Sequence, residues 1–390
     1  MPERFNESKE IRFGIDLFLQ YKTKFQNTRF GLVTNNAATT TDGELSRMAL
    51  LSAGFKIIKL FSPEHGLTAR GIDGAYQKNV IDPITKLPVV SLYSEKIMPH
   101  KNDLTDIDIM LFDIPDIGCR FYTYLWTMTY VMESCSAHHK KFILLDRPNP
   151  VSGDIHLSEG PMIDERGMTS FIGRWNIPIR HSCTLGELAS FFSATRIKNI
   201  DLEVIRLQNW ERKQTGVWPF VSPSPAITDM ETALLYPGMG LLEGINVNEG
   251  RGTSTPFKIF GAPWINATEL QNKFFSLSVA GLKSKPVWYV PTSGLYANEI
   301  CHGLKLSITD TFIFRPVSAG LQLIHLLLSI YPQECTERLY KTTVNPSGEK
   351  HLDNLLGVRE SLRKLKKGEI PETKLDNSLW EMKILPYLIY

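Results

Sequence analysis

The chain has 390 residues, of which 43% are hydrophobic and 22% are charged, a globular composition with room for two domains. Its formal net charge of +2 comes from acidic and basic residues mixed along the sequence, so no basic stripe predicts nucleic-acid binding and no polybasic cluster predicts a membrane partner. The five cysteines are irregularly spaced and form no C-x-x-C pair, which predicts reduced, buried thiols.

Charged residues fill the N-terminus before any apolar run begins, and no segment reaches the length of a membrane span. We therefore expect a cytoplasmic protein from the sequence as given, and a periplasmic or secreted one if a leader has been removed. The oligomeric state has no signal in the sequence.

Strand-like apolar runs alternate with helical stretches between Arg29 and Arg147, which is typical of a parallel sheet covered by helices. Predicted strands cover residues 30–34, 56–61, 89–93, 107–114 and 141–145, and predicted helices cover 43–53 and 124–138. The rhythm changes after a Pro-rich stretch that ends at Pro150, so we predict an α/β domain over residues 1–150.

Polar residues stand where these predicted strands end, which is where open α/β sheets bind ligands. They include Thr34-Asn35-Asn36, Ser62-Pro63-Glu64-His65-Gly66, Tyr93-Ser94-Glu95, Asp113 and Asp146-Arg147. No G-x-G-x-x-G follows the first strand and no G-x-x-x-x-G-K-[ST] occurs, which argues against a dinucleotide or nucleotide enzyme. Carboxylate, imidazole, amide and guanidinium groups suit acid–base hydrolysis instead.

The segment Ser62–Gly66 places Glu64 beside His65 just past a buried strand, between proline and glycine. One interpretation makes Glu64 a proton donor whose pKa is raised in a partly dry cleft. The other makes Glu64 a helix cap and His65 a hydrogen-bonded structural residue. Residue type alone does not separate the two.

A second motif, residues 112–124, joins a strand end to a helix start. Arg120 there is suited to hold a substrate carboxylate bidentately, and Tyr122 to stack on a sugar or bind it by a hydrogen bond. The alternative is an ion pair from Arg120 to Asp113 or Asp116 that shapes the loop.

A third motif, residues 242–253, concentrates Glu243, Asn246, Glu249 and Arg251 among three glycines. Glycine at that density lets a backbone approach a ligand closely, whereas the alternative is a solvated surface loop. The sequence has no H-E-x-x-H, no Cys/His cluster and no G-x-S-x-G elbow, so we expect neither a metal site nor serine chemistry.

The remainder, residues 151–390, is predicted to form a mixed α+β domain. Predicted strands cover 177–180, 201–207, 288–290 and 304–308, and predicted helices cover 231–235 and 316–330, with two more from Val358 onward. A capping-box sequence, Thr184-Leu185-Gly186-Glu187, predicts a helix that runs to about residue 195.

With these residues in place, the chain resembles the NamZ family of exo-β-N-acetylmuramidases over nearly its whole length. The motifs that carry the resemblance include Gly31-Leu32-Val33-Thr34-Asn35, Ser62-Pro63-Glu64-His65-Gly66, Leu87-Pro88-Val89-Val90-Ser91-Leu92-Tyr93, Arg120-Phe121-Tyr122-Thr123-Tyr124, Leu145-Asp146-Arg147-Pro148-Asn149-Pro150, Glu159-Gly160-Pro161, Tyr236-Pro237-Gly238, Leu242-Glu243-Gly244, Glu249-Gly250-Arg251-Gly252-Thr253 and Gly261-Ala262-Pro263-Trp264.

The resemblance implies a Rossmann-like N-terminal domain, a smaller C-terminal domain and an active site in the cleft between them. It also implies a glycoside hydrolase that needs no cofactor and releases N-acetylmuramic acid from the non-reducing end of peptidoglycan fragments. Its partners would then be peptidoglycan-derived amino sugars or muropeptides. The family's catalytic glutamate matches Glu64.

Several positions depart from the family's usual residues. Pro115 replaces a glutamine, Ala226 an asparagine, Ile245 a threonine and Thr255 an arginine, and Asn36-Ala37 stands where Gln-Thr is common. Two alternatives therefore stay open: a non-catalytic relative that binds muropeptides or amino sugars, and a hydrolase of another N-acetylhexosaminide.

The predicted site has catalytic and substrate-binding members. We expect Glu64 to be the general acid and His65 to tune it or brace its loop. The substrate's own 2-acetamido oxygen is a candidate nucleophile, with Glu243, Glu249 or Asp113 orienting that amide or acting directly as nucleophile or base. The expected substrate-binding residues are Asn35, Asp113, Arg120, Tyr122, Asn246 and Arg251, and the two arginines are candidates to grip the lactyl carboxylate.

Overall fold

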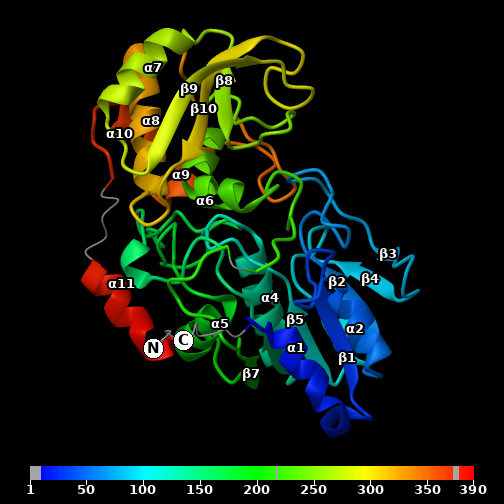
Figure 1. Ribbon diagram of the computed structural model, residues 1–390. Coiled ribbons are helices and arrows are strands. Elements are labelled where there is room, and N and C mark those ends of the chain that lie inside the picture. Colours follow the sequence, from blue (N-terminus) through cyan, green and yellow to red (C-terminus); the bar gives the residue numbers. More distant parts are fainter. Residues whose placement is uncertain (1–9, 217, 372–376) are drawn as a thin grey trace, which may run out of the picture.

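A seven-stranded sheet forms the centre of the larger domain (Figure 1). The computed structural model describes residues 10–216, 218–371 and 377–390. The strands are β1 (Arg29–Thr34), β2 (Lys56–Ser62), β3 (Val80–Ile81), β4 (Pro88–Ser91), β5 (Ile109–Asp113), β6 (Lys141–Leu145) and β7 (Leu202–Ile205).

The strand order is β3-β4-β2-β1-β5-β6-β7, and every neighbouring pair is parallel except β3 with β4. Without the short β3, the parallel strands stand in the order third, second, first, fourth, fifth, sixth along the chain. This is the Rossmann arrangement, and its order reverses between β1 and β5. The predicted Rossmann-like α/β domain is therefore confirmed.

Helices cover both faces of this sheet, as buried parallel strands require. Phe30 and Leu32 of β1 pack in the cluster that contains Phe18, whereas Val33 packs with residues of α4 on the other face. The helical elements of this domain are α1 (Gly14–Phe18), η1 (Leu19–Phe25), α2 (Ser46–Ser52), α3 (Lys101–Leu104), α4 (Tyr124–Ala137), η2 (Ile155–Leu157) and α5 (Leu185–Thr195).

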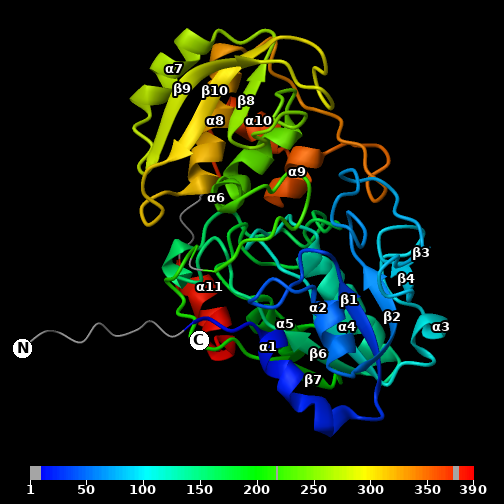
Figure 2. The same ribbon diagram turned by 45° about the vertical axis from the view of Figure 1, so that its right-hand side comes forward.

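The smaller domain is built on a three-stranded antiparallel sheet in the order β8-β10-β9 (Figure 2). Its elements are α6 (Met230–Met239), η3 (Gly240–Gly244), β8 (Ile259–Ala262), α7 (Ala267–Ser276), β9 (Leu282–Tyr289), β10 (Cys301–Ile308), α8 (Pro316–Ile330), α9 (His351–Leu356) and α10 (Ser361–Lys366). Helix α7 packs on the sheet and on α8, which also packs on α6. A second, mixed α+β domain is thus present as predicted.

The larger domain extends beyond the predicted boundary at Pro150. Strand β7 is the last strand of its sheet, and the C-terminal elements α11 (Asn377–Ile384) and η4 (Leu385–Tyr387) return to pack against α5 (Figure 1). The hydroxyl of Tyr390 donates a 2.7 Å hydrogen bond to Asp146 Oδ2. The Pro/Gly-rich change near residue 150 marks a long loop within the domain and not a linker between domains.

Local signals in the sequence had mixed outcomes. The capping box that opens α5 is present, with Glu187 N donating to Thr184 Oγ1 and Thr184 N donating to Glu187 Oε2. The predicted strand at 177–180 is wrong, because Arg180 makes only isolated bridges to Cys119 and Glu159. All five cysteines are free and buried. Among the described residues, no helix combines the length and apolar character needed to cross a membrane.

Candidate active site

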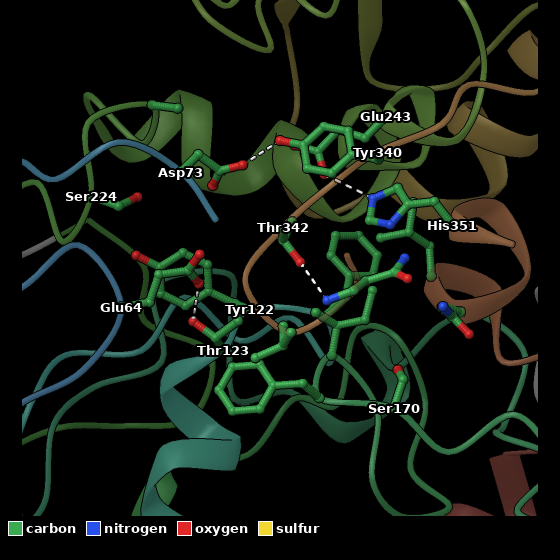
Figure 3. A pocket seen from close by; sticks show the side chains of 18 of the residues that line it. Glu64, Asp73, Tyr122, Thr123, Ser170, Ser224, Glu243, Tyr340, Thr342 and His351 are labelled. Carbon is green, nitrogen blue, oxygen red and sulfur yellow. Dashed lines mark hydrogen bonds and ion pairs between the residues drawn. The ribbon is translucent and has the colours of Figure 1, made fainter. Parts of the chain in front are cut away.

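A cavity of about 300 Å³ lies where the carboxyl ends of the large sheet meet the smaller domain (Figure 3). The segments that follow β2, β4 and β5 supply Glu64, Tyr93 and Thr123 to its wall. The smaller domain and the chain beyond it supply Glu243, Arg251, Tyr340, Thr342 and His351. The two predicted domains therefore share one site.

Glu64 is a buried carboxyl with a partner on each oxygen. The backbone N–H of Gly74 donates to Oε1 at 2.8 Å, and the Thr123 hydroxyl donates to Oε2 at 2.7 Å. Burial is the main cause that raises the pKa of Glu64, and the negative charge of Asp73 raises it further, while His65 and the two hydrogen bonds act in the opposite direction. A raised pKa suits a proton donor.

His65 is held by its backbone and by its ring. Its φ of 65° lies in the left-handed region, which is uncommon for a residue with a side chain. The carbonyl oxygen of Gly71 lies 2.8 Å from Nδ1 and can only accept, so Nδ1 carries a proton. Nε2 then faces Asp73 Oδ1 at 4.0 Å. His65 therefore joins the loop around Glu64 to the neighbouring carboxylate.

Asp73 is the second carboxylate next to Glu64, and it was not among the residues expected from the sequence. Arg251 lies 3.3 Å from its Oδ1, and the Tyr340 hydroxyl donates to its Oδ2. Burial works against its ionisation, but Arg251, His65 and Tyr340 together outweigh burial and lower the pKa of Asp73. Glu64 and Asp73 are thus pushed toward opposite protonation states.

Arg251 is surrounded by carboxylates. It pairs with Glu243 at 2.8 Å, with Asp73 at 3.3 Å and with Glu249 at 3.1 Å. Burial alone would lower the pKa of Arg251, but these acidic neighbours raise it well above its usual value. The guanidinium is therefore paired with three carboxylates of the protein. The sequence-based expectation was that it would be free to bind the lactyl carboxylate of the substrate.

Glu243 and Glu249 differ in their access to the cavity. Glu243 lines it, and its Oε2 lies 3.7 Å from His351 Nε2. Glu249 lies behind Arg251, only 1% exposed, and pairs with Arg338 at 2.9 Å. Burial is the main cause that raises the pKa of Glu249, against the effect of the two arginines. Glu243 is therefore placed to meet a ligand and Glu249 is placed to hold Arg251.

The segment that precedes α9 crosses the cavity. The ring of Tyr340 stacks on that of His351 with centroids 4.4 Å apart and 9° between planes. Thr343 donates from its N–H at 2.8 Å and from its hydroxyl at 3.0 Å to the carbonyl oxygen of Gly74. This segment therefore holds the loop that carries Asp73 and Gly74.

Arg120 does not line the cavity. Its guanidinium is fully buried and donates to the backbone oxygens of Pro161, Ile177 and Leu355 at 2.6, 2.8 and 2.9 Å. These three carbonyls come from loops and from α9, so Arg120 joins the two domains. The geometry supports neither the substrate grip nor the alternative pairing with Asp113 or Asp116.

Three further predicted binding residues also lie away from the cavity wall. Asp113 forms a buried pair with Arg147 at 2.6 Å. The Asn35 side chain accepts from Ala37 N and donates to the Tyr124 hydroxyl. Asn246 bonds Glu334 O and Thr336 N. All three side chains are therefore engaged in structural contacts, and most of these contacts join segments far apart in the sequence.

Tyr122 lies in the cavity wall as expected, packed edge-on against Tyr124 and Tyr236. The glycines of the third motif have a different role from the one expected. A Cβ at Gly250 would come 2.7 Å from Ile259 O, and one at Gly252 would come 2.4 Å from Ser293 O. These glycines let the motif pack on the backbone of the smaller domain, and not on a ligand.

The family departures are spread over the molecule. Ala226 lines the cavity, so the change from asparagine there opens its wall. Ile245 is fully buried in the core, and Thr255 and Pro115 lie outside the cavity wall. One of the four single substitutions is therefore placed to alter what the cavity binds.

Glu64, His65 and Asp73 each offer a ligand atom within 4.8 Å of the others, which is close enough for a shared cation. Both oxygens of Glu64 already accept hydrogen bonds, from Gly74 and Thr123, and Oδ2 of Asp73 accepts one from Tyr340. Arg251 also supplies positive charge beside Asp73. The arrangement favours acid–base chemistry over the holding of a metal ion.

Sequence reasoning missed Asp73, Thr123, Tyr340 and His351. Thr123 stands inside the second motif, and Asp73 follows the Glu64 motif between Gly71 and Gly74, so nearness to those motifs was an available signal. Tyr340 meets Asp73 across 267 positions of the chain. No local pattern marks that contact.

The comparisons with known proteins agree along the chain. Residues 30–231 match the family described as "Exo-beta-N-acetylmuramidase NamZ, N-terminal", and residues 234–390 match the corresponding C-terminal family. A relative from Bacillus subtilis (strain 168), named peptidoglycan beta-N-acetylmuramidase NamZ, is 38% identical over 341 residues, which are 85% of this chain and 82% of the relative.

Two crystal structures of DUF1343 family proteins from Bacteroides fragilis share the fold. One has a TM-score of 0.83 at 28% identity and covers 97% of this chain and 99% of its own. The other has a TM-score of 0.74 at 26% identity and covers 98% and 99%. Since both family matches together span most of the sequence, the chain belongs to the exo-β-N-acetylmuramidase NamZ family.

Proposed function

We propose that this protein is a glycoside hydrolase that releases N-acetylmuramic acid from the non-reducing end of peptidoglycan fragments. The activity in the name of the Bacillus subtilis relative supports this substrate. A cavity of about 300 Å³ is at the small end of the range for ligand sites, and it suits one terminal sugar better than a polymer that passes through.

The pair formed by Glu64 and Asp73 carries the proposal. Burial raises the pKa of Glu64, while Arg251, His65 and Tyr340 outweigh burial and lower the pKa of Asp73. Two carboxyls whose environments separate their pKa values are the usual signature of acid and base roles in one site. Glu64 is the proton donor in this scheme, and Asp73 is the group that stays ionised.

The reaction breaks the bond between the anomeric carbon and the leaving sugar oxygen. Glu64 gives its proton to that oxygen as the bond breaks. The 2-acetamido oxygen of the substrate attacks the anomeric carbon from the other face, and water then opens the cyclic intermediate while Glu64 recovers a proton from that water.

Asp73 is close enough to Glu64 to act in the same step. Ligand atoms of the two lie within 4.8 Å, which is short of the roughly 6.5–9.5 Å that leaves room for an attacking water between two carboxyls. This separation disfavours direct inversion by this pair, and the retaining route that we propose takes the 2-acetamido oxygen as its nucleophile. Asp73 or Glu243 would orient the acetamido N–H and stabilise the positive charge that develops.

Incubation with a chromogenic aryl β-N-acetylmuraminide, and separately with the matching β-N-acetylglucosaminide, tests the proposal. We expect release from the muraminide, and we expect Glu64→Gln to slow that release by about 10²–10⁴-fold when the leaving group needs a proton. Turnover of the glucosaminide alone would show that the substrate is an N-acetylglucosaminide and not an N-acetylmuraminide. Calorimetric binding of N-acetylmuramic acid without turnover of either compound would favour the binding-protein alternative, for which the cavity-lining Ala226 is the motivating position.

A further inference from the structure

A second, shallower hollow of about 560 Å³ adjoins the cavity that contains Glu64. The two share Thr169, Ser170, Phe171 and Val344, which line both. The hollow is completed by Ile97, Tyr130, Arg174 and Trp175. It lies outside the residues assigned above to the chemistry, and its shared rim makes it continuous with the reacting site.

Aromatic rings connect the two spaces. Tyr93, in the cavity wall, meets Phe171 edge-on with centroids 5.4 Å apart. Phe171 in turn stacks on Tyr130 with centroids 5.9 Å apart and 12° between planes. Phe171 is buried, whereas Tyr130 and Trp175 are half-buried, so part of each of these two rings is exposed in the hollow.

Arg174 is a polar residue of the hollow, and its guanidinium is held in place by neighbouring side chains. Its guanidinium carbon lies 3.7 Å from the centroid of Tyr130 and 4.5 Å from that of Trp175. It donates to both oxygens of Glu133, at 2.9 and 3.0 Å, and to the Thr129 hydroxyl at 2.7 Å. Because Glu133 neutralises this cation, the hollow suits an uncharged ligand with hydroxyl and amide groups better than an anionic one.

We propose that this hollow is the leaving-group site, which binds the uncharged N-acetylhexosamine attached to the sugar that is cleaved. The inference rests on the proposed function. An exo-acting enzyme holds the terminal sugar in the cavity, so the rest of the substrate must extend out of it, and the hollow begins at the cavity's rim. Half-buried aromatic rings and a neutralised arginine next to that rim suit the apolar carbons and polar edges of a pyranose.

The test compares two substrates that differ in their leaving group. The disaccharide N-acetylmuramyl-β-1,4-N-acetylglucosamine fills the hollow, whereas an aryl β-N-acetylmuraminide with a good leaving group depends on it less. For Tyr130→Ala we expect the ratio of kcat/KM for disaccharide over aryl glycoside to fall by about 3- to 10-fold, the loss expected for one aromatic contact. Ile97→Trp, which fills the hollow from its rim, should lower the same ratio.

Trp288→Ala is the matched control, because Trp288 is an aromatic residue that is 70% exposed on β9, away from the hollow. Its ratio should equal that of the wild type. Equal losses on both substrates in Tyr130→Ala and Ile97→Trp would overturn the leaving-group site and leave the proposed function standing. A wild-type protein that cleaves neither substrate would overturn both. Melting curves identify a variant that fails to fold, and the ratio in the other variant then decides.

Discussion

The backbone N–H of Gly74 donates a 2.8 Å hydrogen bond to Oε1 of Glu64. The carbonyl oxygen of the same residue accepts two hydrogen bonds from Thr343, which belongs to the segment that leads into α9. The backbone of Gly74 therefore joins the expected general acid to a chain segment far away in sequence. The geometry of Glu64 depends on both domains.

Substitution of Gly74 tests this connection. Its φ of +65° suits glycine, and a Cβ would come 2.6 Å from Thr342 Cγ2. We expect Gly74→Ala to displace the loop and to lower kcat/KM by about 10²-fold, as a misplacement near 1 Å does.

Gly43→Ala is the control for this variant. Gly43 has a φ of +87°, but a Cβ added there would meet nothing within 4 Å, so the substitution introduces the same backbone strain without a collision. Its activity should stay near that of the wild type. Similar activities in the two variants would show that the Gly74 contact does not position Glu64.

The assignment of Glu64 as the proton donor predicts a leaving-group effect. Glu64→Gln keeps the shape and one acceptor but has no proton to give, so kcat for an ordinary muraminide should fall by about 10²–10⁴-fold. A dinitrophenyl glycoside, whose leaving group needs no proton, should recover most of that loss. Steady-state rates on both substrates provide the measurement.

Glu95→Gln is the matched control, since Glu95 also follows a strand of the sheet but is exposed and outside the cavity wall. It should behave like the wild type on both substrates. Near wild-type turnover of the ordinary muraminide by Glu64→Gln would remove Glu64 from the acid role. Glu243 would then be the next carboxyl to substitute.

The pH dependence follows from the direction of the pKa shifts. A general acid works while it is protonated, so kcat/KM should decline as pH rises through the pKa of Glu64, which burial places above the usual value of 4.5. The charge of Asp73 contributes to that rise. Asp73→Asn should therefore move the alkaline limb of the pH–rate profile to lower pH. A limb that does not move, or that moves to higher pH, would contradict the coupling.

Much of the fold could be predicted because its signals are local. Strands β1, β2, β5 and β6 are mainly apolar runs, as buried parallel strands are, and they lie within a residue or two of the predicted ranges. The boundary between the two domains could not be predicted from such local signals. Residues 377–390 return to the larger domain through packing of Trp380 on Phe191 and bonding of Tyr390 to Asp146, and these are long-range contacts.

The site residues, like the fold, could be predicted only in part from local sequence signals. Glu64, His65, Tyr122, Glu243 and Arg251 line the cavity, and all stood in motifs with unusual polar density. Arg120 and Asp113 stood in equally suggestive positions, yet their charges are neutralised or satisfied inside the protein. Residue type shows which chemistry is available, but the direction of a side chain depends on tertiary packing. For that reason the sequence could not separate a binding arginine from a structural one.

The last prediction concerns the removal of Arg251. Its acidic neighbours lead us to expect a different outcome from the one that the sequence suggested. A guanidinium that gripped the lactyl carboxylate would, when lost, impair the muraminide and spare the glucosaminide. Arg251 instead neutralises Asp73, Glu243 and Glu249, and its side chain is 19% exposed. Removal of one partner from a buried charge cluster leaves the others uncompensated, and costs about 3 kcal/mol of stability at the lower end of the usual range.

We therefore expect Arg251→Ala to lower the melting temperature and to reduce kcat/KM on both substrates by a similar factor. Arg363→Ala is the control, since Arg363 forms an exposed pair with Glu360 on α10, which contributes less than about 1 kcal/mol. Thermal melting and paired kinetics on the two aryl glycosides measure the outcome. A normal melting temperature together with a loss confined to the muraminide would instead mean that Arg251 releases its acidic partners to bind the substrate carboxylate. In that case the lactyl group, and not Asp73, would be its partner in the bound state.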